Sequence, residues 1–196
     1  MKILYIGDSH IFHLFPNEDN VIYLVDITLN KIRKGNGDTK IKYESYDKNI
    51  NAIKYIISED GSSLLDFINN FECDYVFLSI GEIDVRYHLS KQISKNINAI
   101  NQIYDIYSNF LKKIKHKMIL SSLTPPNDNI GNRVLITKEA NEIIHKICND
   151  SGYIYYDVYT DFNRDGLLSS EKSDGGTHIN KSFFSYFIEK IKKIII

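Results

Sequence analysis

The sequence is poor in several residue types, among them cysteine, the residue that cross-links small folds through disulfides. Its 196 residues include no tryptophan, three prolines, two methionines and two cysteines. Cys73 and Cys148 are far apart and form no CxxC pair, so they offer neither a disulfide framework nor a thiolate metal site. A chain of this length buries roughly 70% of its unfolded surface and needs no such cross-link. Free thiols are typical of a reducing compartment, and we therefore expect a cytoplasmic location.

A charge excess and a long apolar run are also missing. Lysine and arginine total 24 against 25 aspartates and glutamates, a formal net charge of −1. Because no surplus of positive charge is available for phosphates, we expect no nucleic-acid partner. No stretch approaches the roughly 20 apolar residues of a membrane-spanning helix. The apolar run at residues 2–6 is too short for a signal peptide, and we expect no membrane association.

Metal and nucleotide motifs are absent from the sequence as well. The six histidines are scattered, without HExxH or Cys/His spacing, and neither a Walker motif nor GxGxxG occurs. We therefore predict no metal ion and no organic cofactor.

What the sequence does contain is an alternation of short apolar runs with longer amphipathic stretches. Strands are predicted at residues 2–6, 21–25, 41–46, 75–80, 118–121 and 153–157, with 41–46 at a sheet edge and 153–157 last. Helices are predicted at residues 62–71, 93–114, 132–149 and 180–195. The length suits a single domain, residues 1–196.

This alternation predicts an α/β fold with a mostly parallel sheet of about five strands and helices on both faces. In such sheets, ligands bind beyond the carboxyl ends of the strands. Three unusual polar clusters are predicted to gather at that end of the sheet.

The first cluster, Gly7 to His10, directly follows the first strand. A serine on a tight strand-to-helix turn presents its hydroxyl at the edge of the sheet, and the next helix directs backbone N–H groups at a developing oxyanion. Ser9 is therefore a candidate nucleophile, with Asp8 and His10 beside it. The structural alternative is that Asp8 or Ser9 only caps the helix.

The second cluster, Asp174 to Asn180, lies shortly before the last predicted helix. A serine nucleophile needs a base, and a histidine base needs a carboxylate to fix its tautomer. Asp174 and His178 supply both on one loop. The structural alternative is a glycine-rich loop in which Asn180 caps the helix and His178 is a surface residue.

The third cluster, Gly81 to His88, follows the strand at residues 75–80. Glu82, Asp84, Arg86 and His88 place four ionisable groups within seven positions. An arginine beside two carboxylates forms either a structural ion-pair network or a site for an anionic or polyhydroxylated ligand.

From residue 1 to residue 180 the sequence resembles the SGNH (GDSL-like) hydrolase superfamily. The Gly-Asp-Ser at residues 7–9 matches the nucleophile block of that family, and residues 174–180 resemble its C-terminal Asp and His block. Residues 81–84 lie where the family carries Gly-x-Asn-Asp. The pattern Gly-Glu-Ile-Asp-x-Arg-x-His is similar to a subgroup associated with polysaccharide and glycan genes.

The sequence departs from the family pattern at three places. Ile83 occupies the position of the oxyanion-hole asparagine, and loss of one such donor costs about 10²–10³ in rate, so Arg86 or a backbone N–H has to replace it. The glycine of the second block corresponds to Gly61 or to the glycine-free segment 25–28. Asp174 precedes His178 by four residues instead of three; either the loop absorbs the extra residue or Asp174 is not the partner.

The resemblance implies a flavodoxin-like three-layer fold and hydrolysis, or transfer, of an ester-linked acyl group. It assigns Ser9 as nucleophile, His178 as general base and Asp174 as its orienting acid. The oxyanion and substrate contacts would come from the Ser9 N–H, from Gly61 and from residues 81–88. We predict a serine esterase that removes an acyl group, most simply acetyl, from a small-molecule or glycan ester. The alternatives are an O-acetyltransferase, a non-catalytic carbohydrate-binding module of this fold, and a lipase-like acyl hydrolase.

Overall fold

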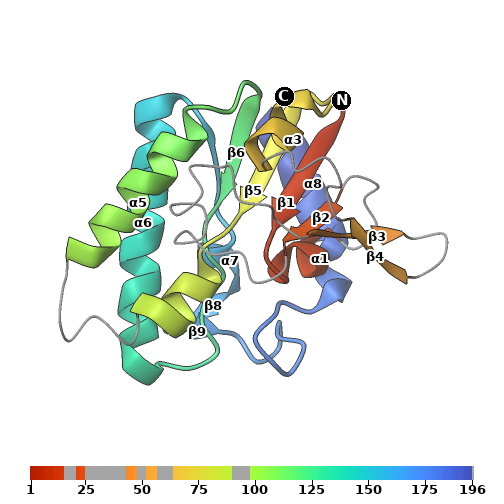
Figure 1. Cartoon of the computed structure of the whole chain (residues 1–196). Helices are drawn as coiled ribbons and strands as arrows, with labels where there is room; N and C mark the ends of the chain where they lie inside the picture. The colour runs from red at the N-terminus through yellow and green to blue at the C-terminus, as the bar shows by residue number, and fades with distance from the viewer. Residues whose placement is uncertain (16–20, 25–42, 48–51, 57–63, 90–97, 196) are drawn as a thin grey trace.

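The computed structural model describes residues 1–15, 21–24, 43–47, 52–56, 64–89 and 98–195, and its centre is a seven-stranded sheet in the order β4-β3-β2-β1-β5-β6-β7 (Figure 1). The strands are β1 (Ile3–Gly7), β2 (Val21–Leu24), β3 (Tyr43–Asp47), β4 (Ala52–Ile56), β5 (Tyr75–Ser79), β6 (Lys117–Ser121) and β7 (Ile154–Tyr156). Four parallel pairings join five neighbouring strands of this sheet, which are β2, β1, β5, β6 and β7. This confirms the predicted mostly parallel sheet.

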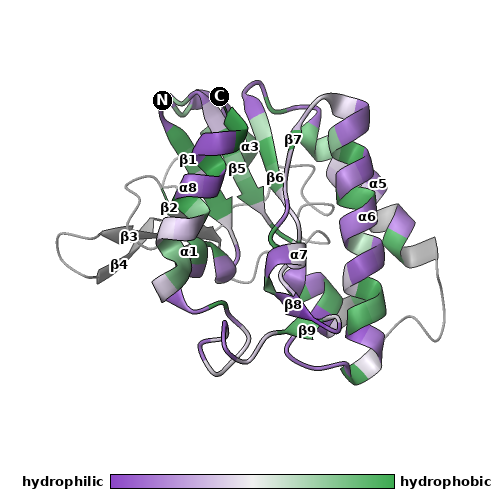
Figure 2. Cartoon of the chain, turned by 180° about the vertical axis from the view of Figure 1, so that it is seen from behind, coloured by the Kyte–Doolittle hydropathy of each residue, from purple (hydrophilic) through white to green (hydrophobic). Residues whose placement is uncertain are grey.

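Helices cover both faces of the sheet, as predicted (Figures 1 and 2). On one face lie α3 (Leu64–Asn70), α5 (Asn98–Leu111) and α6 (Arg133–Ser151). On the other lie α1 (His10–Leu14), α7 (Tyr159–Phe162) and α8 (Phe184–Ile195). Shorter elements are the π-helix η1 (Asp84–Leu89), the 3₁₀ helices η2 (Ile130–Asn132) and η3 (Lys181–Phe183), and the hairpin of β8 (Asn163–Arg164) and β9 (Leu167–Leu168). In the described part of the chain, no helix combines the length and apolar character needed to cross a membrane.

The position of β1 between two layers of helices explains its apolar run. Leu4 and Ile6 are buried in the core beneath α3, α5 and α6, whereas Ile3 and Tyr5 are buried in the core beneath α1 and α8. A strand covered on both faces has no solvent side, so its sequence is continuously hydrophobic instead of alternating. Figure 2 shows hydrophobic central strands, flanked by helices that mix hydrophobic and hydrophilic residues.

Gly7 ends β1 where the backbone of β5 comes closest. A Cβ atom at residue 7 would lie 2.6 Å from the backbone oxygen of Ser79. Asp8 continues the contact, because its N–H donates to the same oxygen at 3.2 Å. The turn that carries Ser9 is therefore fixed directly against the neighbouring strand.

The structure differs from the sequence predictions in four details. The predicted edge strand β3 is interior, because β4 pairs with its outer side. β7 is not the last strand, since the β8–β9 hairpin follows it. The last helix is divided into η3 and α8, and Asn180 caps η3 by accepting from the Ser182 N–H at 3.0 Å. The third polar cluster, expected as a loop, is helical from Glu82 and continues as the π-helix η1.

Candidate active site

Ser9 lies at the carboxyl end of β1 and is the N-terminal capping residue of α1, but its hydroxyl makes no capping bond. The cap is supplied by Asp8 instead, whose carboxylate accepts from the His10 N–H at 3.1 Å. The hydroxyl is therefore left for another partner. Ser9 Oγ lies 2.9 Å from His178 Nε2, which confirms that the two residues are within hydrogen-bond distance.

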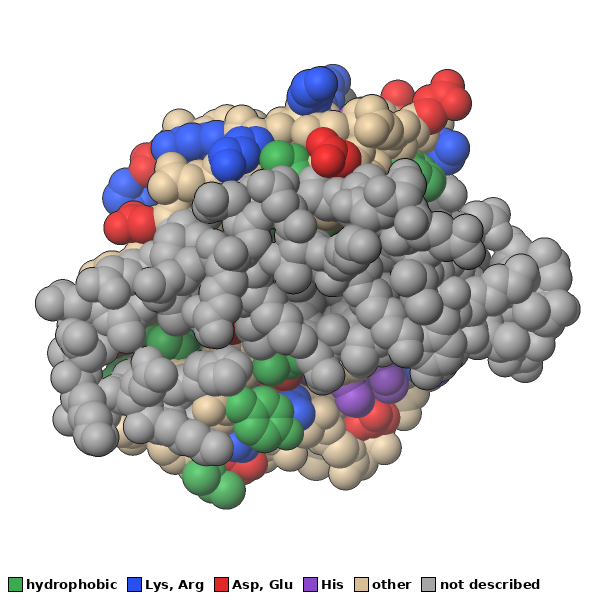
Figure 3. Space-filling view, viewed as in Figure 1, with side chains coloured by type: hydrophobic (Ala, Val, Ile, Leu, Met, Phe, Trp, Pro, Cys, Tyr) green, Lys and Arg blue, Asp and Glu red, His purple; other side chains and the backbone are tan. Residues whose placement is uncertain are grey.

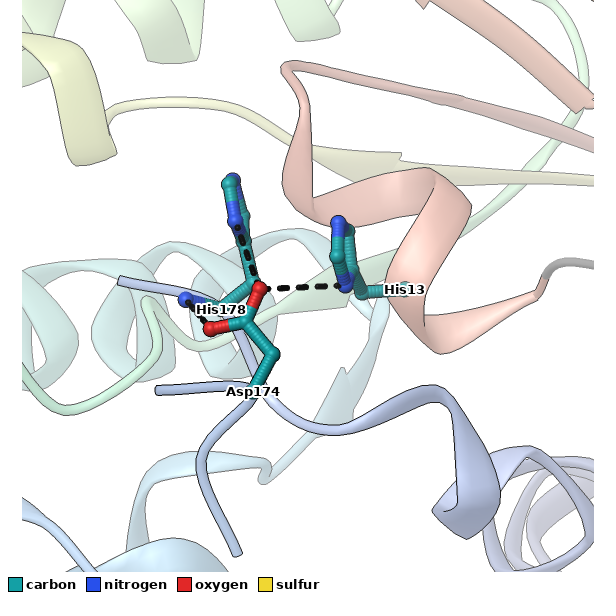
Figure 4. Close-up of side chains that lie close together, drawn as sticks. All are labelled: His13, Asp174 and His178. Atoms are coloured by element: carbon teal, nitrogen blue, oxygen red, sulfur yellow. Dashed lines mark hydrogen bonds and ion pairs between the residues drawn. The ribbon is translucent and has the colours of Figure 1, made fainter. Parts of the chain in front are cut away.

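A tight turn brings Asp174 to the other side of the same imidazole (Figure 4). The Asp174 N–H donates to the His178 carbonyl at 3.0 Å, which closes the turn. Asp174 Oδ1 accepts from the backbone N–H groups of Gly176 at 2.8 Å and His178 at 3.3 Å. This leaves Oδ2 3.4 Å from His178 Nδ1. The extra residue in the Asp–His spacing is thus absorbed within the turn.

The charges around His178 favour a neutral imidazole. Burial lowers the pKa of His178, and His10 lowers it further, against the opposing effect of Asp174. Burial raises the pKa of Asp174, but its two backbone donors and His178 outweigh burial and the net pKa is lowered. With an ionised carboxylate facing Nδ1, the proton belongs on Nδ1 and the lone pair on Nε2 faces Ser9. That tautomer is the one that can take a proton from a serine hydroxyl.

His13 is a third member of this group that the sequence reasoning missed. Its ring stacks on that of His178, with centroids 4.1 Å apart and planes 8° apart. Its Nδ1 lies 3.9 Å from Asp174 Oδ2 and 3.2 Å from the carbonyl oxygen of Ile179. Burial lowers the pKa of His13 to about 4, with further lowering from His178 and Lys181. A usable signal was present, because residues 9 and 13 are four apart and so share one face of a helix.

Near Ser9, a partly buried chain of ionisable side chains runs from Asp8 through His10 to Glu82 and Arg86. His10 Nε2 lies 3.6 Å from Glu82 Oε2, and Glu82 Oε1 forms an ion pair with Arg86. His10 Nδ1 is 3.2 Å from the hydroxyl of Thr124, which follows β6. The third cluster therefore contains an ion-pair network, the structural alternative considered for Arg86.

The pKa values in this chain favour a charged His10 between carboxylates. Burial lowers the pKa of His10, but Glu82 and Asp8 outweigh it and the net pKa is raised. Burial raises the pKa of Glu82, yet His10 and Arg86 bring the net pKa below its ordinary value. For Asp8, burial prevails and raises the pKa to about 6. His10 and Glu82 thus stabilise each other, whereas Asp8 is destabilised when ionised.

The remaining sequence candidates have varied positions. Asp84 is 1% exposed and is one cause of the raised pKa of Tyr104, second to burial, so it belongs to the core side of η1. Gly81 is buried, directly before Glu82. His88 belongs to η1, but its side chain is outside the described set. Gly61, like segment 25–28, lies outside the described residues.

A crevice adjoins the charged chain at the carboxyl end of the sheet. Its lining includes Glu82, Arg86, Thr124, Asn127 and Arg133. Arg133 is held there because Nη1 donates to both oxygens of Asp128, at 2.8 and 2.7 Å. The crevice therefore combines these hydrogen-bonding side chains with the apolar side chains of Val85, Leu123 and Pro126.

The comparisons with known proteins give matches among solved structures. A scan against protein-family models finds no match, and a search of curated proteins finds none either. The chain is similar to an acetyl xylan esterase, with 14% identity, full coverage of both chains and a TM-score of 0.62. It is also similar to a catalytic mutant of an acetylxylan esterase from Geobacillus stearothermophilus, with 12% identity, coverage of 99% of this chain and 93% of that one, and a TM-score of 0.60.

A third similar structure is assigned to the G-D-S-L family of lipolytic proteins and comes from Desulfitobacterium hafniense. It shares 12% identity, with 98% of each chain covered and a TM-score of 0.58. Identities of this size establish the fold alone. The chain has the three-layer α/β fold found in GDSL-like hydrolases, with Ser9, His178 and Asp174 in contact at the carboxyl end of its sheet.

Proposed function

We propose that this protein is a serine esterase of the SGNH type that removes an acyl group, in particular acetyl, from a sugar or glycan. The observation that carries the proposal is the contact series from Ser9 Oγ to His178 Nε2, 2.9 Å, and from His178 Nδ1 to Asp174 Oδ2, 3.4 Å. A nucleophile, a neutral base and an ionised orienting group stand in the order that acyl transfer requires.

In the proposed mechanism, Ser9 Oγ attacks the ester carbonyl carbon while its proton passes to His178 Nε2. Asp174 Oδ2 stabilises the imidazolium that forms. When the tetrahedral intermediate collapses, the alcohol oxygen leaves with the Nε2 proton and the acyl group stays on Ser9. Water then enters, gives a proton to Nε2 and releases the acid as Ser9 regains its hydrogen.

The developing oxyanion needs donors, and the Ser9 backbone N–H is the one we assign first. Ile83, at the family's asparagine position, carries no side-chain donor. Arg86 is already paired with Glu82. We therefore assign a structural role to Arg86, as the ion-pair partner of Glu82, and keep Gly61 as the proposed second backbone donor.

A reactive fluorophosphonate tests the nucleophile directly. Wild-type protein should be labelled, Ser9→Ala should not, and Ser108→Ala, on α5 outside the site, should be labelled like wild type. Equal labelling of wild type and Ser9→Ala would contradict the assignment. A folded, unlabelled wild type would favour the alternative of a carbohydrate-binding module, which the isoleucine at residue 83 also favours.

The acyl group and the acceptor are tested by turnover. An acetyl esterase should hydrolyse acetyl esters of 4-nitrophenol and acetylated oligosaccharides with a higher kcat/KM than octanoyl esters, and the reverse order would indicate a lipase-like enzyme. Adding an unacetylated sugar acceptor separates hydrolysis from transfer. Free acetate as the main product supports the esterase, whereas acetylated acceptor supports the acetyltransferase.

A further inference from the structure

His13 makes contacts for which the proposed triad has no use. A serine–histidine–carboxylate set needs one imidazole against the carboxylate, and His178 fills that role. His13 directs a second imidazole nitrogen at the same oxygen, Asp174 Oδ2 (Figure 4). The two rings are stacked and come from distant parts of the chain, one from α1 and one from the loop before η3.

The three groups have the donor set and spacing of a transition-metal site. One ligand atom from each of His13, Asp174 and His178 lies within 4.8 Å of the other two. Asp174 Oδ2 is 3.4 Å from His178 Nδ1 and 3.9 Å from His13 Nδ1. Ligands at about 2.0–2.1 Å around a tetrahedral Zn²⁺ are roughly 3.3 Å apart. To close the set on one ion, the two imidazoles have to approach each other and tilt out of their stacked arrangement, because an imidazole nitrogen binds a metal in the plane of its ring.

The carboxylate is prepared for this role by the turn that holds it. Its Oδ1 is committed to the N–H groups of Gly176 and His178, so the other oxygen is fixed toward the imidazoles. All three side chains are partly exposed, with 18–30% of their side-chain surface accessible. Figure 3 shows histidine side chains at the surface beside an acidic side chain. An ion can therefore reach the group from solvent.

We propose that His13, Asp174 and His178 form an inhibitory site for a divalent transition metal such as Zn²⁺. The inference rests on the proposed function for its inhibitory part only. Two imidazoles and a carboxylate are ligands that zinc accepts, with water at the fourth position.

Metal binding changes which nitrogen of the His178 imidazole carries the proton, and this removes the proposed base. A metal bound at His178 Nδ1 displaces the proton from that atom, and the neutral ring then carries its single proton on Nε2. Nε2–H can only donate to Ser9 Oγ, so the ring no longer accepts the serine proton. His13 likewise gives up the hydrogen bond from its Nδ1–H to the Ile179 carbonyl oxygen, and its single proton moves to Nε2. No proton is gained or lost overall, and the nucleophile loses its base.

The experiment measures Zn²⁺ binding by calorimetry to full-length wild type, Ser9→Ala, His13→Phe and His13→Gln. Phenylalanine keeps a ring to stack on His178, and glutamine keeps a polar group for the Ile179 carbonyl. Wild type and Ser9→Ala should bind one Zn²⁺ with equal affinity, and both His13 variants should lose at least about tenfold. His145→Phe, the same change at an exposed histidine on α6, should bind like wild type.

Turnover of an acetyl ester provides the second measurement. Zn²⁺ should lower the turnover rate of the wild type, and a chelator should restore that rate. At the same Zn²⁺ concentration, each His13 variant should turn over at the rate that it shows without zinc. Zinc binding that survives both His13 substitutions, or no binding at all, overturns the site. Zinc bound through His13 without loss of turnover overturns the inhibition. Because Ser9→Ala binding needs no activity, failure of the esterase proposal leaves the metal test intact.

Discussion

At the residue scale, Asp8 and Ser9 are neighbours in opposite environments. Ser9 is half-buried and faces His178, whereas Asp8 is 1% exposed and its carboxyl pKa is raised to about 6, first by burial. A charge kept in such a place reduces the stability of the folded chain. This cost falls beside the proposed nucleophile, where the charge of Asp8 also interacts with those of His10 and Glu82.

Asp8→Asn should therefore stabilise the protein at neutral pH and above. The pKa of Asp8 is about 6 in the folded protein against an ordinary 3.8, so ionisation costs stability as pH rises between these values. The gain in the free energy of unfolding should approach zero at pH 4 and reach at most about 3 kcal/mol above pH 7. Urea unfolding of both proteins at pH 4, 6 and 8 checks this. A gain independent of pH would show that the charge is not its cause.

Arg86→Lys separates a structural role of Arg86 from a catalytic one. Lysine keeps the charge but loses the planar fork that contacts Glu82. Loss of about 1 kcal/mol from this partly buried pair should lower the Tm by about 2–4 °C. The kcat and KM for a small acetyl ester should stay within about twofold of wild type per folded molecule. A lower kcat with unchanged KM would instead identify Arg86 as a donor to the transition state.

The sequence predicts Ser9 and His178 as candidate nucleophile and base because each lies in a short motif. His13 has no motif, and its role depends on α1 packing against a loop 165 residues further on, as does the stacking of the two rings. The pairing of Arg86 with Glu82 was an open alternative, because a sequence does not give the direction of a side chain. Helical periodicity from residue 82 decides it, since residues 82 and 86 then lie on one face.

At the element scale, the fold was predictable wherever an apolar run is buried on both faces, as in β1 and β5. β4 escaped prediction because Lys54 interrupts its apolar residues, and within the described part of the chain β4 pairs with β3 alone, at the edge of the sheet. The π-helix η1 replaced an expected loop, since Arg86 pairs with Glu82 and Asp84 is buried. A run of ionisable residues resembles a loop in composition even when some of them pair one helical turn apart or are buried.

Gly7→Ala tests the close approach of β1 and β5. The new Cβ would lie 2.6 Å from the Ser79 carbonyl oxygen, a backbone atom that the parallel pairing holds in place. Overpacking of this kind costs about 1–3 kcal/mol, so the Tm should fall by about 2–12 °C. Gly152→Asn is the control, because a side chain there meets nothing within 4 Å and asparagine tolerates a φ of +69°. An unchanged Tm for Gly7→Ala would mean that the strands can separate at low cost.

At the scale of the whole molecule, the two cores share one sheet. Leu4 and Tyr5 are consecutive residues of β1, yet they belong to opposite cores. Neither core can lose its strands without exposing the other. We therefore expect residues 1–196 to unfold as one domain, in a single cooperative transition. Coincident melting curves from circular dichroism and from tyrosine fluorescence check this, and two separated transitions would contradict it.

The contact between Ser9 and His178 also joins residues 169 positions apart in the chain. A ribosome adding about 5–20 residues per second needs roughly 8–34 s to pass from one to the other. Under the proposed mechanism, the nascent chain carries its nucleophile without a base during that interval. We therefore expect an emerging or prematurely terminated product to be inert toward esters, with activity only once nearly the whole described chain has been made and the loop that carries His178 has folded beside α1.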